Sequence, residues 1–398
     1  MAAEARGPSL QSIAEATTAW SSAFNRSIKE RYALLQRSLE VTGATLSALP
    51  KVDYMSLRNA ILLIEQHNAL LPPWTPQVLK TLSEKHRNQV IEDGCHYMQL
   101  SEAAYGWRGA LAMGMLGGTD SGASALSGVL GSVMSGDKAA FAHRAGVQVD
   151  SILYRSVDSE LQEPHHWLVV DHERRELDPH HTPPYTACRG TINVDDAVMD
   201  LTATAVPFLR GQAHEGMAAA AHKLHASCFS GDRLNLPGRL ESLPGYGLVL
   251  TGHSLGGSVA VLLTMLLLHH RHEMEAALPP RHHAHVPLHG VPIRCVAFGM
   301  APVYSSRSPL PPGTHQAITA FVNGDDIVSR LSVRSFNRYM RLAGAVAAAA
   351  PTLAESISAS MMMKETRSPA EVIQAGLRSA TQHPDVEDEP ELHIPGHI

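Results

Sequence analysis

The sequence predicts an α/β fold in which a mostly parallel sheet is covered by helices on both faces. Short apolar runs with strand character alternate with longer helical patterns. Polar residues follow three of these runs, at Gly190-Thr191, Ser254 and Asp325-Asp326. In such sheets, ligand sites form beyond the carboxyl ends of the strands. The predicted strands are Trp167–Asp171, Tyr185–Arg189, Tyr246–Gly252, Ile293–Phe298 and Ala317–Asn323.

The chain is organised around Tyr246–Leu263, where an apolar run meets a tight turn and then a helical pattern. Ser254 lies at the apex of this turn, within Gly252-His253-Ser254-Leu255-Gly256. Such a turn lifts the serine hydroxyl clear of the sheet and places it beside free N–H groups at the helix start. Ser254 is therefore the candidate nucleophile; the alternative interpretation is a glycine-rich turn with an idle serine.

Composition is ordinary for a globular protein of 398 residues, with 44% hydrophobic and 18% charged residues. The net charge of −6 provides no basic field for nucleic acid. Cys95, Cys188, Cys228 and Cys295 lie far apart without a C-x-x-C pair. We expect them to be buried small residues in a reducing compartment rather than disulfides or zinc ligands.

The sequence indicates neither a secretory signal nor a transmembrane helix. The first twenty residues contain Glu4 and Glu15 and lack an apolar core segment, so no secretory signal is predicted. No window reaches about 18 uninterrupted apolar residues, so no transmembrane helix is predicted. The expected location is cytoplasmic or on a membrane surface.

Residues 1–92 are predicted to form a helical extension. Within it, Ser56–Leu71 has apolar residues at helical spacing, and Pro72 ends the pattern. This helix either packs on the rest of the chain or offers a partner or membrane surface. Tyr97–Trp107 predicts a further helix, and the Gly/Ala/Ser-rich Gly109–Ser135 is either a mobile cover over a pocket or a loosely packed connector.

A serine nucleophile needs a base, an acid that orients the base, and N–H donors for the oxyanion. In sheets of this kind the chain order is serine, then aspartate or glutamate, then histidine. The next strand end with a carboxylate after Ser254 is Asn323-Gly324-Asp325-Asp326-Ile327-Val328.

With these segments the chain resembles the class 3 (fungal-type) lipases, and among them the sn-1-specific diacylglycerol lipases. The resemblance implies an α/β-hydrolase fold over residues 93–398, incomplete at its C-terminal end. The matching blocks, between about Cys95 and Arg338, are Ala103–Trp107, Arg189–Thr191 with Asp196 and Asp200, His214–Met217, Gly252–Gly257, Ala297–Gly299 with Pro302, and Asn323–Ser332.

Carried over position by position, the resemblance makes Ser254 the nucleophile and Asp326 the triad acid. The oxyanion hole is expected from the backbone N–H groups of Thr191 and Leu255. Asp325 is expected to be a capping or turn residue. Ser329 stands where the family usually has proline, a departure at a turn.

Two further aspartates, Asp196 and Asp200, are expected to cap or brace the helix after the oxyanion strand.

The catalytic histidine is not assigned. The family places it on a loop after the strand that follows the acid, and that strand corresponds to Glu391–Ile398, where the sequence ends. His393 and His397 are candidates on or before the strand. The favoured expectation is a fragment whose base lies past residue 398.

Two segments lie outside the motifs. Seven histidines between His269 and His289 are expected in a Pro-containing loop, which we interpret as a solvated insertion rather than a zinc or nickel site. Residues 335–390 contain an Ala/Leu-rich pattern at Met340–Leu353. They are interpreted either as a lid with apolar surface for lipid or as an amphipathic helix on the core.

The resemblance thus implies a serine lipase that hydrolyses an acyl ester of a glycerolipid, with diacylglycerol favoured, through an acyl-serine intermediate. The alternatives are an inactive hydrolase-fold protein that binds lipid or a partner, and a phospholipase or galactolipase. No cofactor or metal is expected, with an effect of calcium left open. The expected partners are the glycerolipid and the surface of a membrane or lipid droplet, with no nucleic acid.

Overall fold

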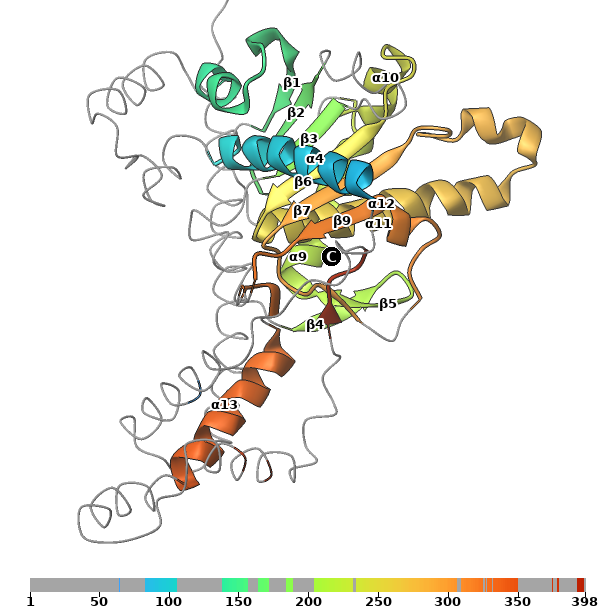
Figure 1. Cartoon of the computed structure of the whole chain (residues 1–398). Helices are drawn as coiled ribbons and strands as arrows, with labels where there is room; N and C mark the ends of the chain where they lie inside the picture. Colours follow the sequence, from blue (N-terminus) through green and yellow to red (C-terminus); the bar gives the residue numbers. More distant parts are fainter. Residues whose placement is uncertain are drawn as a thin grey trace, which may run out of the picture.

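Two sheets form the core of the protein in a computed structural model (Figure 1). The main sheet has six strands in the order β1-β2-β3-β6-β7-β9, and the second has four in the order β10-β8-β5-β4. The structure describes residues 83–105, 138–156, 164–171, 184–188, 204–231, 234–305, 309–324, 328–330, 332–349 and 392–396, with Ile64, Asp326, Gln374 and Arg378.

The strands of the main sheet are β1 (Ile152–Arg155), β2 (His166–Val170), β3 (Pro184–Cys188), β6 (Leu248–His253), β7 (Ile293–Phe298) and β9 (Ile318–Phe321). Those of the second sheet are β4 (Ala205–Phe208), β5 (Gly211–His214), β8 (Tyr304–Ser305) and β10 (Leu392–His393). The helices are α4 (Glu84–Ala103), α9 (Glu215–Phe229), α10 (Leu236–Glu241), α11 (Leu255–Ala277), α12 (Thr314–Ala317) and α13 (Val333–Ala349). Three 3₁₀ turns are η1 (Val149–Ser151), η2 (Pro280–His285) and η3 (Val328–Arg330).

The site-bearing half of the main sheet is parallel. Strands β3, β6, β7 and β9 pair in parallel, whereas β1–β2 and β2–β3 are antiparallel. Strand β6 passes directly into α11 through the turn at Ser254. The predicted α/β-hydrolase fold, with a mostly parallel sheet and helices on both faces, is confirmed.

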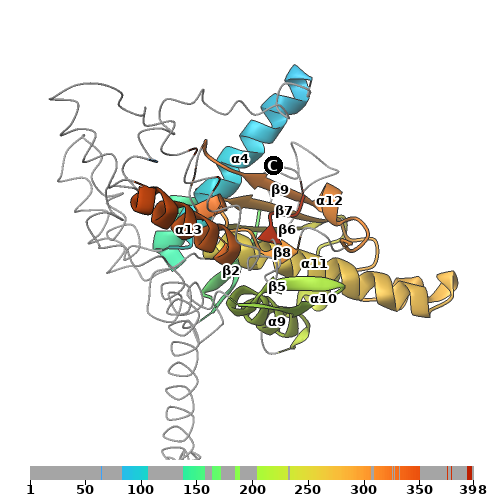
Figure 2. The same cartoon turned by 90° about the horizontal axis from the view of Figure 1, so that it is seen from below.

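Alternation along β6 divides its side chains between two cores. Leu248 and Leu250 are fully buried in the larger core, with residues of α9 and α11. Val249 faces the other way and is buried with Tyr97 and Leu100 of α4. Because side chains of a strand alternate between its faces, one apolar run can anchor helices on both sides. Figures 1 and 2 show α4 on one face and α9 and α11 on the other.

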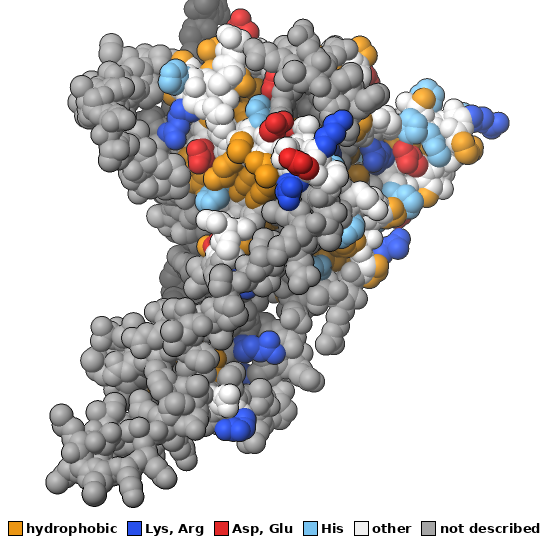
Figure 3. Space-filling view, viewed as in Figure 1, with side chains coloured by type: hydrophobic (Ala, Val, Ile, Leu, Met, Phe, Trp, Pro, Cys, Tyr) orange, Lys and Arg blue, Asp and Glu red, His pale blue; other side chains and the backbone are white. Residues whose placement is uncertain are grey.

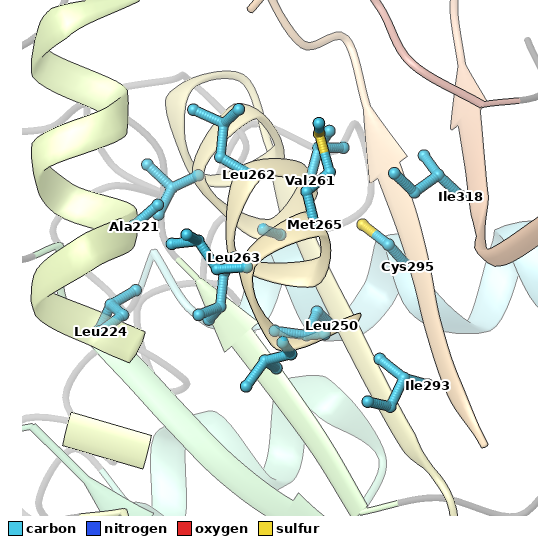
Figure 4. Packing of buried hydrophobic residues seen from close by; sticks show 14 of the residues in the cluster. Ala221, Leu224, Leu250, Val261, Leu262, Leu263, Met265, Ile293, Cys295 and Ile318 are labelled. Atoms are coloured by element: carbon cyan, nitrogen blue, oxygen red, sulfur yellow. The ribbon is translucent and has the colours of Figure 1, made fainter. Parts of the chain in front are cut away.

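Helix α11 is the central support of the nucleophile turn. All its residues from Leu255 to Leu268 are buried, as expected of a helix enclosed between a sheet and a second helix. Figure 4 shows Leu263 and Met265 among Leu250 and Cys295 of the sheet, with Leu224 of α9 nearby. This packing fixes the helix start, and hence Ser254, relative to the strand ends.

Helix α4 is longer than predicted. It begins at Glu84, where Ser83 caps it by accepting a hydrogen bond from the backbone N–H of His86 at 3.3 Å. It continues through position 92, the predicted domain boundary, and ends at Ala103. The division at 92/93 stays a prediction. Cys95, expected to be buried, is exposed on this helix because its position faces away from the sheet, whereas Cys228 and Cys295 are buried.

The prediction of a loop at His269, His270 and His272 is wrong, because these residues are helical. His269, His270 and His272 belong to the last turns of α11, which runs to Ala277, and the loop begins only afterwards. His282, His283 and His285 form much of η2. The helical pattern continues past the buried part because Glu, Met and Ala are good helix formers.

The second sheet was not predicted. Its strands are two to four residues long and include polar sequences such as Gly211–His214 (GQAH), which lack strand periodicity. The C-terminal strand pattern is confirmed only for Leu392–His393, which pairs with Tyr304–Ser305.

Several predicted segments lie outside the described residues. These are Gly109–Ser135, most of residues 1–92 and most of 335–390. Of Ser56–Leu71, the structure describes Ile64, which is helical and buried. The Met340–Leu353 pattern begins earlier, as α13, and Figure 1 shows this helix running away from the sheets. None of the helices in the described ranges has the length and apolar character needed to cross a bilayer.

Candidate active site

Ser254 occupies a strained turn between β6 and α11. Its backbone angles are φ 54° and ψ −129°, a region that non-glycine residues rarely adopt. The strain persists because both flanking elements are buried and hydrogen-bonded. The backbone N–H of Ser254 donates to the carbonyl of Phe298 at 2.9 Å, and its own carbonyl accepts from Ser258 at 3.1 Å. The turn has the geometry predicted for a nucleophile elbow.

Glycines allow the strand and helix of this turn to approach. A Cβ added to Gly252 would lie 2.4 Å from the carbonyl carbon of Gly256, closer than real Cβ contacts. A Cβ added to Gly257 would lie 2.8 Å from the carbonyl oxygen of Gly252. The two elements can therefore pack this closely only because these side chains are absent, as the sequence predicted.

Backbone donors are available beside the serine. Leu255 is the first residue of α11, and the first N–H groups of a helix have no intrahelical acceptor. An N–H at this position can donate to an oxyanion next to Ser254. The second predicted donor, Thr191, lies outside the described residues, as do Asp196 and Asp200.

Asp326 follows β9 at the same edge of the sheet as Ser254. Strand β7 lies between β6 and β9, and hydrogen bonds connect the three strand ends: Ser254 donates to Phe298, and Gly299 donates to Phe321 at 2.9 Å. A Cβ added to Gly299 would lie 3.1 Å from Oδ2 of Asp326. The acid thus approaches the end of β7 directly beside the residue that holds Ser254. Asp325 lies outside the described residues.

The Asp326 carboxylate has two local donors. Its Oδ1 accepts the backbone N–H of Val328 at 3.0 Å, and its Oδ2 accepts the hydroxyl of Ser329 at 3.2 Å. The Asp326 backbone N–H donates to the carbonyl of Asn323 at 3.1 Å. These bonds fold the segment after β9 into a tight turn that directs the carboxylate back toward the sheet.

His253 lies beside this carboxylate but is tied to Tyr105. Its Nδ1 is 2.8 Å from the Tyr105 hydroxyl, and the two rings are 5.8 Å apart. Burial lowers the pKa of His253, while the negative charges of Asp326 and Glu102 oppose this effect. Burial thus favours the neutral form of the ring. Its hydrogen bond to Tyr105 fits a structural role better than that of the base for the adjacent serine.

The structure places the weak base candidate His393 in the second sheet. Its Nδ1 hydrogen-bonds the carbonyl of Tyr304 at 2.7 Å, and its carbonyl accepts from Val303 at 3.0 Å. Within the described residues, its polar contacts are with this strand and not with Ser254 or Asp326. His397 lies outside the described residues. The identity of the base thus stays a prediction.

Three residues of this edge were missed as functional candidates: Tyr105, Gly299 and Ser329. Each had a signal in the sequence. Tyr105 and Gly299 belong to the matching blocks, and Ser329 is the departure from the family's proline. Their contacts with His253 and Asp326 join segments far apart in the chain, which sequence spacing alone does not reveal.

The predicted alternative of a metal site among the histidines gains no support in the described residues. No group of three or more His, Cys, Asp or Glu side chains within the described ranges could hold a metal ion. Near the end of α11, His289 Nδ1 instead contacts Glu275 at 2.7 Å, and His283 Nε2 contacts the carbonyl of Leu278 at 3.0 Å.

Comparisons with known proteins agree with the motifs. Residues 185–336 match the model of the family described as "Lipase (class 3)". Diacylglycerol lipase-beta of Mus musculus is 26% identical over 265 residues, which is 63% of this chain and 35% of that protein. The chain therefore spans about a third of the length of this curated relative.

Solved lipases are also similar. A lipase of Rhizomucor miehei in complex with its propeptide has a TM-score of 0.36 at 18% identity, over 62% of this chain and 65% of that one. A lipase of Rhizopus microsporus var. chinensis has a TM-score of 0.39 at 18% identity, over 62% and 71% of the two chains. Over residues 185–336 the chain is thus similar to the class 3 lipases, and over a longer stretch to a diacylglycerol lipase.

Proposed function

We propose that this protein is a serine lipase that hydrolyses an acyl ester of a glycerolipid. The observation that carries the proposal is the position of Ser254, strained at the start of α11, on the same sheet edge as the carboxylate of Asp326. A strained serine between a strand and a helix exposes its hydroxyl at helix N–H groups. An acid on a neighbouring strand end is where an orienting partner for a histidine is needed.

In the proposed reaction the Ser254 hydroxyl attacks the acyl carbonyl carbon. A histidine takes the hydroxyl proton and then gives it to the glycerol oxygen as that oxygen leaves. The acyl group remains on Ser254 as an ester. Water, deprotonated by the same histidine, then attacks this ester, and the fatty acid leaves as Ser254 recovers its proton.

Two parts of the site stabilise the charges that develop during this reaction. The N–H of Leu255, with that of Thr191, donates to the oxygen that becomes negative, and losing one such donor typically costs about 2.7–4 kcal/mol of transition-state stabilisation. Asp326 accepts from the histidine and stabilises its protonated form. We propose diacylglycerol as the substrate because the matched relative is a diacylglycerol lipase. The lipid would be reached at a membrane or lipid-droplet surface.

The direct test compares the wild-type chain with Ser254→Ala on p-nitrophenyl butyrate and on dispersed diacylglycerol. The substitution removes one oxygen from a turn whose strain does not depend on it. We expect no detectable hydrolysis by the variant and an unchanged thermal unfolding midpoint. Equal hydrolysis by both forms would refute the role of Ser254.

A second candidate is a catalytically inactive domain that binds lipid or a partner. It is favoured by the contacts of the described histidines: His253 is bonded to Tyr105 and His393 to Tyr304, so neither has its Nδ1 available to Asp326. A fluorophosphonate probe distinguishes the two, because it labels a serine only when the serine is activated. Labelling that Ser254→Ala abolishes supports the lipase, and a blank with wild type supports the binding domain.

Among enzymes, a phospholipase or galactolipase is distinguished by substrate. Wild-type protein incubated separately with diacylglycerol, phosphatidylcholine and monogalactosyldiacylglycerol should release fatty acid fastest from diacylglycerol. Faster release from either of the other lipids would replace diacylglycerol as the proposed substrate while leaving the serine mechanism in place.

A further inference from the structure

The Asp326 carboxylate is hydrogen-bonded on one side and faces a small space on the other. On one side, Ser329 donates its hydroxyl to Oδ2 at 3.2 Å and Val328 its N–H to Oδ1 at 3.0 Å. On the other side, the missing side chain of Gly299 leaves a small space. The Cβ position there is 3.1 Å from Asp326 Oδ2 and 3.4 Å from His253 Nε2. The carboxylate and the imidazole edge therefore border the same space.

The Nδ1 edge of His253 is hydrogen-bonded to Tyr105, so the Nε2 edge is the one that faces this space. The Tyr105 hydroxyl is 2.8 Å from Nδ1, and Tyr105 is itself buried, at 5% exposure. A neutral imidazole carries a single N–H, so a hydroxyl that donates to Nδ1 leaves the ring proton on Nε2. The N–H dipole then has its positive end at the nitrogen nearest the Asp326 carboxylate.

Ser329 supplies a donor that the residue usual in the family could not. Proline at this position has neither a hydroxyl nor an N–H. Ser329 is buried, at 9% exposure, and its hydrogen bond to Oδ2 of the half-buried Asp326 is partly buried. Each carboxylate oxygen can accept two hydrogen bonds. Acceptor capacity therefore remains for the imidazole of the catalytic base.

We propose that Ser329 and the Tyr105–His253 pair are positioning residues that hold the Asp326 carboxylate, from its two sides, in the orientation required by the catalytic histidine. The inference rests on the proposed function, in which Asp326 is the triad acid. A carboxylate has a broad terminal torsion, so the hydrogen bonds from Val328 and Ser329 and the dipole of the His253 ring across the space together restrict its rotation. An acid fixed before the reaction orients the base without further reorganisation.

The kinetic test removes one hydroxyl at a time. Ser329→Ala and Tyr105→Phe should each lower kcat on p-nitrophenyl butyrate roughly five- to tenfold, because the first deletes a hydrogen bond to the acid and the second deletes the bond that orients His253 beside it. KM should stay within about twofold, since neither hydroxyl is proposed to touch the substrate. Ser329→Thr keeps the hydroxyl and should recover most of the lost kcat.

Matched controls remove equivalent hydroxyls elsewhere. Ser242→Ala deletes a hydroxyl that donates to the backbone carbonyl of Arg239. Tyr154→Phe alters a tyrosine of the edge strand β1, which lies at the opposite side of the sheet from β9. Both should keep kcat at the wild-type level. If Ser329→Ala and Tyr105→Phe match these controls in kcat, the inference is wrong.

A second measurement does not require turnover. In ¹⁵N-histidine-labelled full-length chain, with His253 assigned from a His253→Gln spectrum, Asp326→Asn removes the nearby negative charge. The titration midpoint of His253 should then move to lower pH. In Tyr105→Phe, the His253 nitrogen shifts should move from a single Nε2–H tautomer toward a tautomer average. If both variants leave the His253 signals unchanged, the proposed contact does not exist.

The two measurements separate the possible failures. If the wild-type chain neither hydrolyses ester nor reacts with the fluorophosphonate, the proposed function fails. In that case the NMR measurements alone decide whether His253 and Tyr105 hold the carboxylate. If the wild type is active but the kinetic and NMR variants behave as controls, only the positioning inference fails.

Discussion

The two ends of α11 are constructed in opposite ways. At its start, Leu255 and the residues up to Leu268 are all buried between the sheet and α9. At its other end, the helix passes beyond the sheet, and His272, Glu273 and Ala277 are exposed. Figure 3 shows histidine side chains gathered on the projecting part, together with arginine. The same helix thus carries a rigid, strained serine at one end and a solvated, histidine-rich extension at the other.

This contrast between the two ends of α11 shows where backbone strain can be maintained. A φ of 54° at Ser254 costs of order 1–3 kcal/mol and needs surroundings that allow no alternative. The buried half of α11 provides them through close packing. The exposed half is held by local contacts, such as Arg271 donating to the carbonyl of Val291 at 2.6 Å and Glu275 with His289. A reactive residue on that half would lack comparable support.

The strongest predicted effect is a loss of catalysis, and it concerns the site at the buried end of α11. Asp326→Asn preserves the shape of the acid but presents an amide to the catalytic histidine, so the wrong tautomer is stabilised. We expect kcat for ester hydrolysis to fall by about 10³–10⁴-fold, as this substitution does in serine proteases. The measurement is steady-state kinetics with p-nitrophenyl butyrate, with circular dichroism as the control for folding. A decrease of less than tenfold would contradict the role of Asp326.

The next effect concerns stability and compares the two ends directly. Leu263→Ala opens a cavity among Leu250, Leu224 and Met265, and should lower the free energy of unfolding by about 2–5 kcal/mol. His272→Ala changes an exposed position of the same helix and should alter it by less than about 0.5 kcal/mol. Urea unfolding curves measure both. Similar losses for the two variants would show that the exposed end is as tightly packed as the buried one.

The smallest effect depends on pH and lies where the two regions meet. His225 of α9 lies near His270 and Phe229, with ring distances of 5.2 and 5.1 Å, and its Nε2 is buried without a hydrogen-bond partner among the described residues. Burial, together with the positive charges that the nearby His270 and His222 can carry, lowers its pKa to about 4. The unfolded chain therefore binds a proton here that the folded chain excludes between about pH 6.5 and pH 4.

Stability contributed by neutral His225 is present above about pH 6.5 and is lost as the pH falls toward 4. Because the side chain is partly exposed, we expect only about 1 kcal/mol of extra destabilisation at pH 5 relative to pH 7.5. His225→Gln cannot be protonated and should lose less stability over this range. Urea unfolding at the two pH values checks this; equal losses for variant and wild type would assign the acid sensitivity to other groups.

Much of the buried region could be predicted from the sequence. The run from Leu248 to Gly252 and the glycines around Ser254 predicted strand, turn and helix, because strand alternation and close backbone approach depend on local residue types. The position of Asp326 followed from the order of motifs. The hydrogen bonds of Ser329 and of Tyr105 did not, because they depend on turn geometry and on where α4 ends relative to β6.

The exposed region was predicted less well for a physical reason. The residue at which a helix ends depends on helix propensity, capping and solvation, which differ by only about one kcal/mol per residue. The histidine-rich sequence after Leu268 contains no strong helix-terminating residue before Pro279. The second sheet was missed because strands as short as Tyr304–Ser305 form through neighbouring strands rather than through their own pattern. The assignment of Thr191 and of the catalytic histidine stays a prediction.

The proposed lipase requires an activated Ser254, and fluorophosphonate labelling followed by intact-mass measurement tests this most directly. We expect addition of one probe molecule to the wild-type chain, located by peptide mapping at Ser254, with no addition to Ser254→Ala and strongly slowed addition to Asp326→Asn; this is the result that activation of Ser254 requires. A wild-type chain that is folded and remains unlabelled, or that is labelled equally when Ser254 is alanine, would contradict it.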